Sequence, residues 1–400
     1  MKIGIIKERK NPPDRRVVLS PTICKELLKT FNDLEIVVES SPNRVFSDSQ
    51  YQENGINVVQ DVSDCDVLLG VKEVPINHLI PNKKYFFFSH TIKKQSYNRD
   101  LLNAILERNI ELHDHEVITN QNNIRLVAFG RYAGIVGAYN CFRTYGLKTD
   151  LYNLPKAEEL SDREALIHEL SKIKLPSIKV VLTGKGRVGN RAREMLVGMG
   201  MKEVTVDEFL SDNFEEAVFV QIDVLDYNTR IDGVQKEMDD FFVNASEYKS
   251  DFMKFARVAD FYIAGHFYGQ GAPYLFTRND AKNDDFNIKV VADVSCDIDG
   301  PVASTIRSST IEKPNYGYHP ESESEVDFKN SAAIAVMAVD NLPCELPKDA
   351  SDGFGESFAK HVIPSFFNND ELGILERSRM TENGTLTTRF SYLQDYVDGK

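Results

Sequence analysis

The sequence lacks the features that define several large classes of protein. No apolar run is long enough to span a membrane, and no long apolar region of a signal peptide follows Met1, so we expect a cytoplasmic protein without a membrane partner. Lys and Arg number only 47 against 61 Asp and Glu, and the net charge of −14 argues against nucleic acid as a partner. The five cysteines are scattered without a Cys-x-x-Cys pair, which is typical of reduced thiols rather than a disulfide framework.

What the first third of the chain does contain is an alternation of short apolar runs and helical patterns. The runs expected to form strands are residues 3–6, 34–38, 66–71, 84–89 and 110–113, and the expected helices are residues 21–31 and 100–108. Such alternation predicts a parallel sheet with helices on its faces, which is an α/β fold. A Gly- and Ala-rich helix is expected to follow within residues 125–143.

The rest of the chain repeats the pattern and indicates a second domain of the same class. The expected strands are residues 178–182, 204–206, 218–222, 261–264 and 289–292, and the expected helices are residues 162–172, 191–198, 332–339 and 350–358. Residues 223–260 are interpreted as an acidic, aromatic-rich insertion with helices. We therefore predict two Rossmann-like, doubly wound domains with an interdomain cleft. Residues 1–140, completed by 345–400, would form a substrate domain, and residues 141–344 a dinucleotide domain.

A glycine loop lies between the strand at 178–182 and the helix that follows it. Its glycines, Gly184, Gly186 and Gly189, have the spacing of a dinucleotide-binding turn, in which the loop backbone, with Arg187 and Val188, and the N-terminus of the following helix contact the diphosphate. The alternative is a glycine-rich turn without a ligand. The strand–loop–helix context favours the cofactor site.

An acidic residue about 20 positions after such a loop accepts hydrogen bonds from the adenosine ribose. Asp207 follows the expected strand at 204–206 and is the candidate. A carboxylate there favours NAD over NADP, because it would repel a 2′-phosphate. The alternative is that Asp207 only caps a turn, since Asp is a common turn residue.

Several motifs resemble one family, the alanine dehydrogenase and transhydrogenase group, which also contains the lysine-forming saccharopine dehydrogenases. The motifs of the group are residues 7–9, 15–21, 70–75, His90 and 292–295. A second set of motifs is more similar to the lysine–2-oxoglutarate reductase domain of lysine catabolism. These motifs are residues 87–93, 125–130, 309–312, 340–343, 346–347 and 383–386. The resemblance implies an NAD(P)-dependent oxidoreductase that interconverts saccharopine with L-lysine and 2-oxoglutarate. The fused reductases of this branch use NADP, so the cofactor and the direction stay open.

The resemblance also implies roles for individual residues. Lys72 and His90 match the acid–base pair of the group, whereas alone they would be interpreted as a solvated lysine and a structural histidine. Arg16 matches its substrate arginine, and Asp293 its aspartate beside the nicotinamide. The further substrate-binding candidates are Glu73, Lys93, Glu116 and Arg125, for which the alternatives are surface ion pairs and solvated carboxylates.

Other interpretations stay open at this point. Alanine dehydrogenase shares Lys72, His90, Arg16 and Asp293, and a non-catalytic, transhydrogenase-like protein would share the glycine loop. His113, His115 and Glu116 could form a metal cluster, but no further ligand set accompanies them, and we expect no metal. Cys296 lies in the expected active-site loop without a motif for a nucleophile. The sequence does not indicate the oligomeric state.

Overall fold

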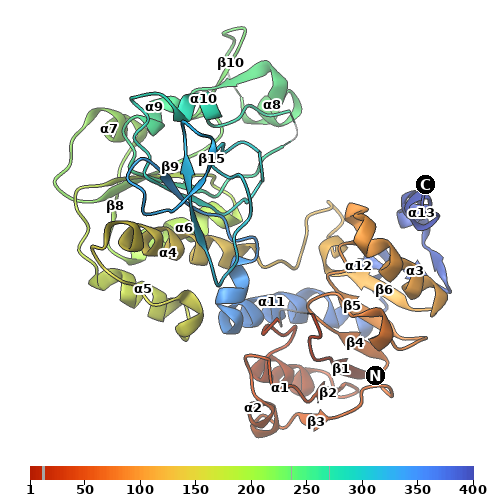
Figure 1. Cartoon of the computed structure of the whole chain (residues 1–400). Helices are drawn as coiled ribbons and strands as arrows, with labels where there is room; N and C mark the ends of the chain where they lie inside the picture. Colours follow the sequence, from red (N-terminus) through yellow and green to blue (C-terminus); the bar gives the residue numbers. More distant parts are fainter. Residues whose placement is uncertain (11–13, 236, 270) are drawn as a thin grey trace. The chain divides into compact units, whose positions relative to one another are not determined.

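Two mainly parallel sheets form the framework of the chain, each within its own unit (Figure 1). The computed structural model describes residues 1–10, 14–235, 237–269 and 271–400. Unit 1 consists of residues 1–129 and 347–400, and unit 2 of residues 130–346. Helices cover the sheets of both units, so the predicted α/β class is confirmed. The boundary expected at residue 140 falls inside a helix, α4 (Gly130–Thr149), that belongs wholly to unit 2 because it packs on that unit's sheet.

The sheet of unit 1 has six strands in the order β3-β2-β1-β4-β5-β6, all parallel. The strands are β1 (Lys2–Ile5), β2 (Glu35–Glu39), β3 (Asn57–Val59), β4 (Val67–Leu69), β5 (Lys84–Phe87) and β6 (Glu111–Asp114). This is the strand order of a doubly wound dinucleotide-binding fold, whose ligands lie beyond the carboxyl ends of the strands. The loops after β4, β5 and β6 therefore define the functional edge of unit 1.

The end of the chain completes unit 1. Helix α11 (Pro347–His361) packs beside α1 (Pro21–Thr30), where a Cβ added to Gly355 would lie 2.7 Å from Ile23 Cδ1. The Val17 N–H donates to Ser351 Oγ at 2.9 Å. A buried cluster includes residues of helix α3 (Arg99–Glu107) together with Met380, Phe390 and Leu393 from the last segment. Unit 1 is therefore built from both ends of the sequence.

The sheet of unit 2 has eight strands in the order β15-β14-β16-β13-β12-β7-β9-β8. Its strands are β7 (Lys179–Thr183), β8 (Lys202–Glu203), β9 (Val218–Ile222), β12 (Phe261–Ala264), β13 (Val290–Asp293), β14 (Asn315–His319), β15 (Ser324–Val326) and β16 (Ile334–Met337). The six neighbouring strands β8, β9, β7, β12, β13 and β16 are all parallel. The hairpin β14–β15 extends the sheet at its other edge, where β14 is antiparallel to β16. Strand β9, not β8, is the neighbour of β7, so the strand after the glycine-loop helix lies at the edge of the sheet.

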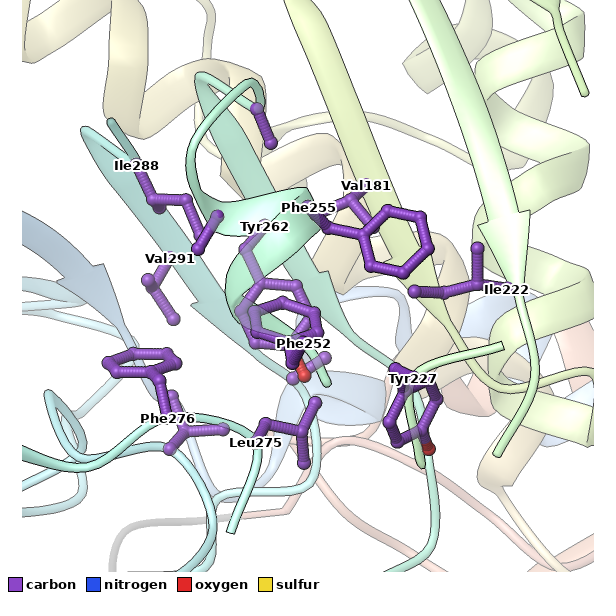
Figure 2. Close-up of a cluster of buried hydrophobic side chains, with 14 of the residues drawn as sticks. Val181, Ile222, Tyr227, Phe252, Phe255, Tyr262, Leu275, Phe276, Ile288 and Val291 are labelled. Carbon is purple, nitrogen blue, oxygen red and sulfur yellow. The ribbon is translucent and has the colours of Figure 1, made fainter. Parts of the chain in front are cut away.

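Alternate residues of the unit 2 strands face two different layers. Phe261 points to α4, where its ring lies 5.8 Å from that of Phe142 and 4.6 Å from that of Tyr145. Tyr262, the next residue, belongs to the opposite cluster with Phe252, which Figure 2 shows together with Val181 and Val291 from neighbouring strands. Both faces of the sheet are therefore buried, as parallel sheets require.

Two predicted elements are wrong. Residues 332–339 were expected to be helical, but β16 (Ile334–Met337) is a strand buried between β13 and β14. A short continuous apolar run fits a fully buried strand as well as a buried helix, and the neighbouring strands decide the outcome. Residues 204–206 are not a strand either, because helix α7 (Val206–Ser211) begins there.

The remaining elements surround these sheets. The helices are α2 (Asp48–Glu53), α5 (Arg163–Lys172), α6 (Arg187–Gly198), α8 (Met238–Val243), α9 (Met253–Ala256), α10 (Arg278–Ala281), α12 (Ile374–Ser378) and α13 (Gln394–Val397). The remaining strands are β10 (Asn228–Arg230), β11 (Tyr248–Ser250), β17 (Thr381–Glu382) and β18 (Thr385–Leu386). Among the described residues, the helices are too short or too polar to cross a membrane.

Candidate functional site

At two of the three glycine positions in the loop of unit 2, a residue with a Cβ would not fit. Gly184 has φ of +90°, and a Cβ there would lie 2.6 Å from the carbonyl oxygen of Gly265. A Cβ on Gly189 would lie 1.9 Å from the oxygen of Gly184. Around Gly186, by contrast, a Cβ would meet nothing within 4 Å, so this position leaves open space beside the backbone. Such space is what the approach of a diphosphate requires.

Helix α6 presents its first backbone N–H groups at this loop. Its N-cap is Gly186, which has no capping side chain, and Arg187 and Val188 form the first turn. Helix α4 lies against it so closely that a Cβ on Gly134 would be 2.1 Å from the Val188 oxygen. An uncapped helix start held in this way favours binding of an anionic phosphate. The geometry therefore fits the diphosphate of a dinucleotide.

Asp207 does not have the position expected for it. It is an exposed residue in the first turn of α7, after the N-cap Thr205, whose side chain and that of Glu208 form a capping box. The capping box starts the helix here, and the strand that precedes it, β8, is separated from β7 by β9. Asp207 therefore does not close the strand beside the glycine loop, and the residue that caps α7 is Thr205 rather than Asp207.

Asp293 holds the loop after β13. Its carboxylate is buried, and Oδ1 accepts hydrogen bonds from the N–H groups of Ser295 at 3.1 Å and Cys296 at 3.0 Å, while Oδ2 accepts one from Thr305 Oγ1 at 2.7 Å. These bonds make it a positioning residue for the loop. Burial and the charge of Asp293 raise the pKa of the Cys296 thiol to about 12, so this cysteine is a thiol rather than a nucleophilic thiolate at neutral pH.

A buried polar cluster that the sequence analysis missed lies beside the glycine loop. His266 Nδ1 is 3.0 Å from Thr183 Oγ1 and 3.4 Å from the hydroxyl oxygen of Tyr262. Thr183 ends β7, and His266 follows β12, so the parallel pairing of these strands brings them together. Burial lowers the pKa of His266 to about 4, which keeps its ring neutral. A lone histidine after a strand gave no sequence signal for this contact.

In unit 1, the loops after β5 and β6 bring His90 and Glu116 together. His90 Nδ1 lies 3.3 Å from Glu116 Oε2, and Lys93 Nζ lies 3.4 Å from Glu116 Oε1. Burial alone would raise the pKa of Glu116, but the hydrogen bond with His90 and the charge of Lys93 lower it to about 2. His90 has φ of 55°, a left-handed backbone conformation that few non-glycine residues adopt, although histidine adopts it more often than most.

Lys72 follows β4 and is positioned by a residue that the sequence analysis did not single out. The two carboxyl oxygens of Glu8 accept hydrogen bonds from the N–H groups of Val71 at 2.6 Å and Lys72 at 2.9 Å. Burial, together with the charge of Asp14, raises the pKa of Glu8 to about 8. Glu73 is bound instead by Lys10, whose Nζ lies 2.6 Å from Oε1. The sequence signals for Glu8 were its place in the motif at residues 7–9 and its position just after the first strand.

The two arginines predicted to bind substrate have different surroundings. The side chain of Arg16 is 2% exposed and donates from Nε and Nη2 to Asp14 at 3.0 and 2.6 Å. It is therefore a buried ion pair rather than an accessible receptor for a carboxylate. Arg125 is half-buried, lies 5.3 Å from the ring centroid of Phe88, and contributes to the low pKa of Glu116. Arg125 thus shares the site of His90.

The histidines once considered for a metal cluster make other contacts. His113 lies 2.9 Å from Glu111 Oε1 and 2.8 Å from Ser378 Oγ, and His115 Nε2 bonds the Gly70 oxygen at 2.9 Å. Burial lowers the pKa of His115 to about 3. In the part of the chain that the structure describes, no group of three or more His, Cys, Asp or Glu side chains is arranged to hold a metal ion.

Fold and site together define a class: an α/β protein with two doubly wound units, one of which carries a dinucleotide-type glycine loop and the other a histidine–carboxylate pair. Comparison with known proteins adds a match between part of the chain and one family of domains. Residues 4–136 match the family model described as "Alanine dehydrogenase/PNT, N-terminal domain". This match covers most of the first segment of unit 1 and confirms the resemblance predicted from the motifs.

Several curated relatives align with most of the chain. Alpha-aminoadipic semialdehyde synthase of Arabidopsis thaliana is 26% identical over 98% of this chain, and the mitochondrial protein of that name from Mus musculus is also 26% identical over 98%. The chain spans 41% and 47% of these two proteins, less than half of their length. A "Saccharopine dehydrogenase [NAD(+), L-lysine-forming]" of Yarrowia lipolytica is 24% identical, over 90% of both chains.

Solved structures support the fold. An L-alanine dehydrogenase superposes with a TM-score of 0.63 and 17% identity, over 100% of this chain and 99% of that one. A transhydrogenase from Sinorhizobium meliloti gives a TM-score of 0.63 with 16% identity, over 97% of this chain and 100% of that one. At these identities, the likeness establishes the two-unit α/β architecture.

Proposed function

We propose that the chain is a nicotinamide-dinucleotide-dependent oxidoreductase that acts on the CH–NH group of saccharopine and interconverts it with L-lysine and 2-oxoglutarate. Unit 2 would bind the dinucleotide through its glycine loop, and the loops of unit 1 would supply the acid–base groups. The names of the relatives support this branch, and the fungal relative's name states NAD(+) and lysine formation. We also place the protein in the cytoplasm, because its five cysteines are free thiols.

The observation that carries the proposal is the pair formed by His90 and Glu116. With a pKa of about 2, Glu116 is ionised at neutral pH and can only accept hydrogen bonds. Nδ1 of His90 is therefore the donor in this hydrogen bond, and in a neutral ring the lone pair of Nε2 would serve as the base. A histidine oriented by a carboxylate in this way is suited to general acid–base catalysis.

The reaction needs such a base. In the oxidative direction, His90 would take the proton of the secondary ammonium, since a protonated amine has no lone pair to expel a hydride. A bound nicotinamide supplies the acceptor for the hydride that leaves the adjacent carbon. Water then adds to the imine, and proton transfers through Lys72 and His90 would break the carbinolamine into the lysine amine and the 2-oxoglutarate carbonyl.

The charges around the pair favour a substrate with several carboxylates. Lys93 and Arg125 lie near Glu116, and Lys10 lies beside Glu73 near Lys72. Saccharopine carries three carboxylates and two amino groups, whereas alanine carries one of each. We propose Arg125 and Lys93 as carboxylate ligands and Glu73 and Glu116 as partners for the amino groups.

The test is an assay of NADH and NADPH oxidation by the purified protein. We expect turnover with lysine plus 2-oxoglutarate and none with pyruvate plus ammonium. The variant His90→Gln should lose at least 100-fold in kcat, the usual contribution of a general base, while binding NADH as the parent does. The matched control is His78→Gln, a change at an exposed histidine of the same unit.

Two results would contradict the proposal. Turnover only with pyruvate and ammonium would assign the chain to alanine dehydrogenase. Dinucleotide binding without turnover of either substrate pair would indicate the non-catalytic, transhydrogenase-like alternative. Full activity of His90→Gln with lysine plus 2-oxoglutarate would leave the reaction standing but would remove His90 as its base.

A further inference from the structure

The strand order of unit 2 determines which residue lies beside the glycine loop. Strand β9 is paired with β7 along its whole length, with Thr183 opposite Ile222. The Gly184 N–H donates to the Ile222 oxygen at 2.8 Å, and Gln221 Nε2 donates to the Gly184 oxygen at 2.8 Å. The residue that follows is Asp223. It therefore has the position that Asp207 was expected to have, at the carboxyl end of the strand next to the loop.

The local geometry presents Asp223 at this edge. Its side chain is half-buried, and Oδ1 accepts from the Val224 N–H at 2.8 Å. Its own N–H donates to Asp226 Oδ2 at 2.7 Å, so the turn after β9 is closed by a second carboxylate. Asp226 in turn lies 3.8 Å from Nζ of Lys185, the residue between the first two glycines of the loop. The glycine loop is thus joined to the end of β9 by one backbone and one side-chain hydrogen bond, and to the turn after β9 by an ion pair.

The charges at this edge bear on the choice between the two dinucleotides. Two carboxylates, Asp223 and Asp226, follow the strand beside the loop, and Lys185 of the loop pairs with Asp226. A carboxylate accepts hydrogen bonds from the 2′- and 3′-hydroxyls of a ribose, whereas a 2′-phosphate in the same place would be repelled. We infer that Asp223 binds the hydroxyls of the adenosine ribose and selects NAD over NADP.

This inference rests only on the part of the proposed function that concerns dinucleotide binding. It assigns the ribose ligand from the pairing of strands rather than from the count of residues after the glycine loop. The count leads to Asp207, and the pairing leads to Asp223. The two assignments make different predictions for the same substitution.

The experiment measures dissociation constants of NADH and NADPH by fluorescence titration of the full chain, without any substrate. The wild type should bind NADH more tightly. Asp223→Asn should weaken NADH binding about tenfold or more, the usual effect of losing a charged hydrogen-bond partner, and should weaken NADPH binding less or strengthen it. The matched control is Asp207→Asn, which should leave both constants within about twofold. A thermal unfolding curve for each variant shows that the fold is kept.

Each other outcome has a definite meaning. A loss of NADH affinity in Asp207→Asn but not in Asp223→Asn would overturn the inference, and so would a wild type that prefers NADPH. In the second case, Lys185→Met would show whether the loop lysine binds the 2′-phosphate instead. If the wild type binds neither nucleotide, both the dinucleotide part of the proposed function and this inference are wrong. If it binds NADH but lacks turnover with lysine, the inference stands.

Discussion

Glu345 is a buried carboxyl at the end of unit 2, where Asn140 Nδ2 donates to its Oε1 at 2.9 Å. Burial raises its pKa to about 7, above the ordinary value of 4.5. Between these two values the folded state holds a proton that the unfolded state has released. Stability therefore falls as the pH rises from about 4.5 to 7 and is level above that range.

The variant Glu345→Gln should remove this pH dependence, because an amide cannot ionise but can still accept from Asn140. We expect the difference in free energy of unfolding, variant minus wild type, to increase by about 2–3 kcal/mol between pH 5 and pH 8. Urea unfolding of both proteins at the two pH values measures the difference. Parallel pH profiles would show that the carboxyl is already ionised at pH 5.

At the scale of elements, the start of α6 is the feature that depends most on glycine. The variant Gly189→Ala places a Cβ at 1.9 Å from the Gly184 oxygen, so the helix or the loop must shift. We expect it to lower the Tm by several degrees, a destabilisation of roughly 1–3 kcal/mol, and to abolish NADH binding.

The matched variant is Gly186→Ala, whose Cβ meets no atom within 4 Å. It should unfold within about 2 °C of the wild type, yet weaken NADH binding, because the methyl group occupies the space that the diphosphate needs. Equal thermal stability of both variants would mean that the close packing at Gly189 is not required for the fold.

Elements with their own local signal were predicted well from the sequence. Strands β9 and β12 have the predicted bounds, since their apolar runs end at polar or small residues on both sides. The helix expected over residues 332–339 failed because a run such as Ile334–Met337 carries no periodicity that separates strand from helix. The neighbours β13 and β14, distant in sequence, decide it.

Within the candidate site, the sequence supplied candidate residues but not the neighbours of each one. The motifs led to His90, and Glu116 was a further substrate-binding candidate; the structure brings His90 Nδ1 to 3.3 Å from Glu116 Oε2. They could not show that Asp14 pairs with Arg16, or that β9 replaces β8 beside the glycine loop. Strand order is a property of tertiary packing, and one sequence does not display it.

At the scale of the whole molecule, the two units should differ in what they need to fold. Residues 130–346 form unit 2 without a break, whereas unit 1 requires α11, whose Phe354 and Phe358 pack against Phe129, Phe86 and His115. A chain that ends at residue 346 should therefore keep a folded unit 2 that binds NADH. Its first 129 residues should be digested rapidly in limited proteolysis. Protection of those residues would show that the first segment folds without α11.

The same arrangement sets an order of events during synthesis on the ribosome. The strands of unit 1 are translated first, but the helix that covers them emerges only after the complete unit 2 has left the exit tunnel. At 5–20 residues per second, roughly 10–40 s separate the synthesis of the two segments of unit 1. During that time, the apolar sheet face that α11 covers stays exposed. A nascent chain of this design should be a client of chaperones, which would hold the first segment until the last one arrives.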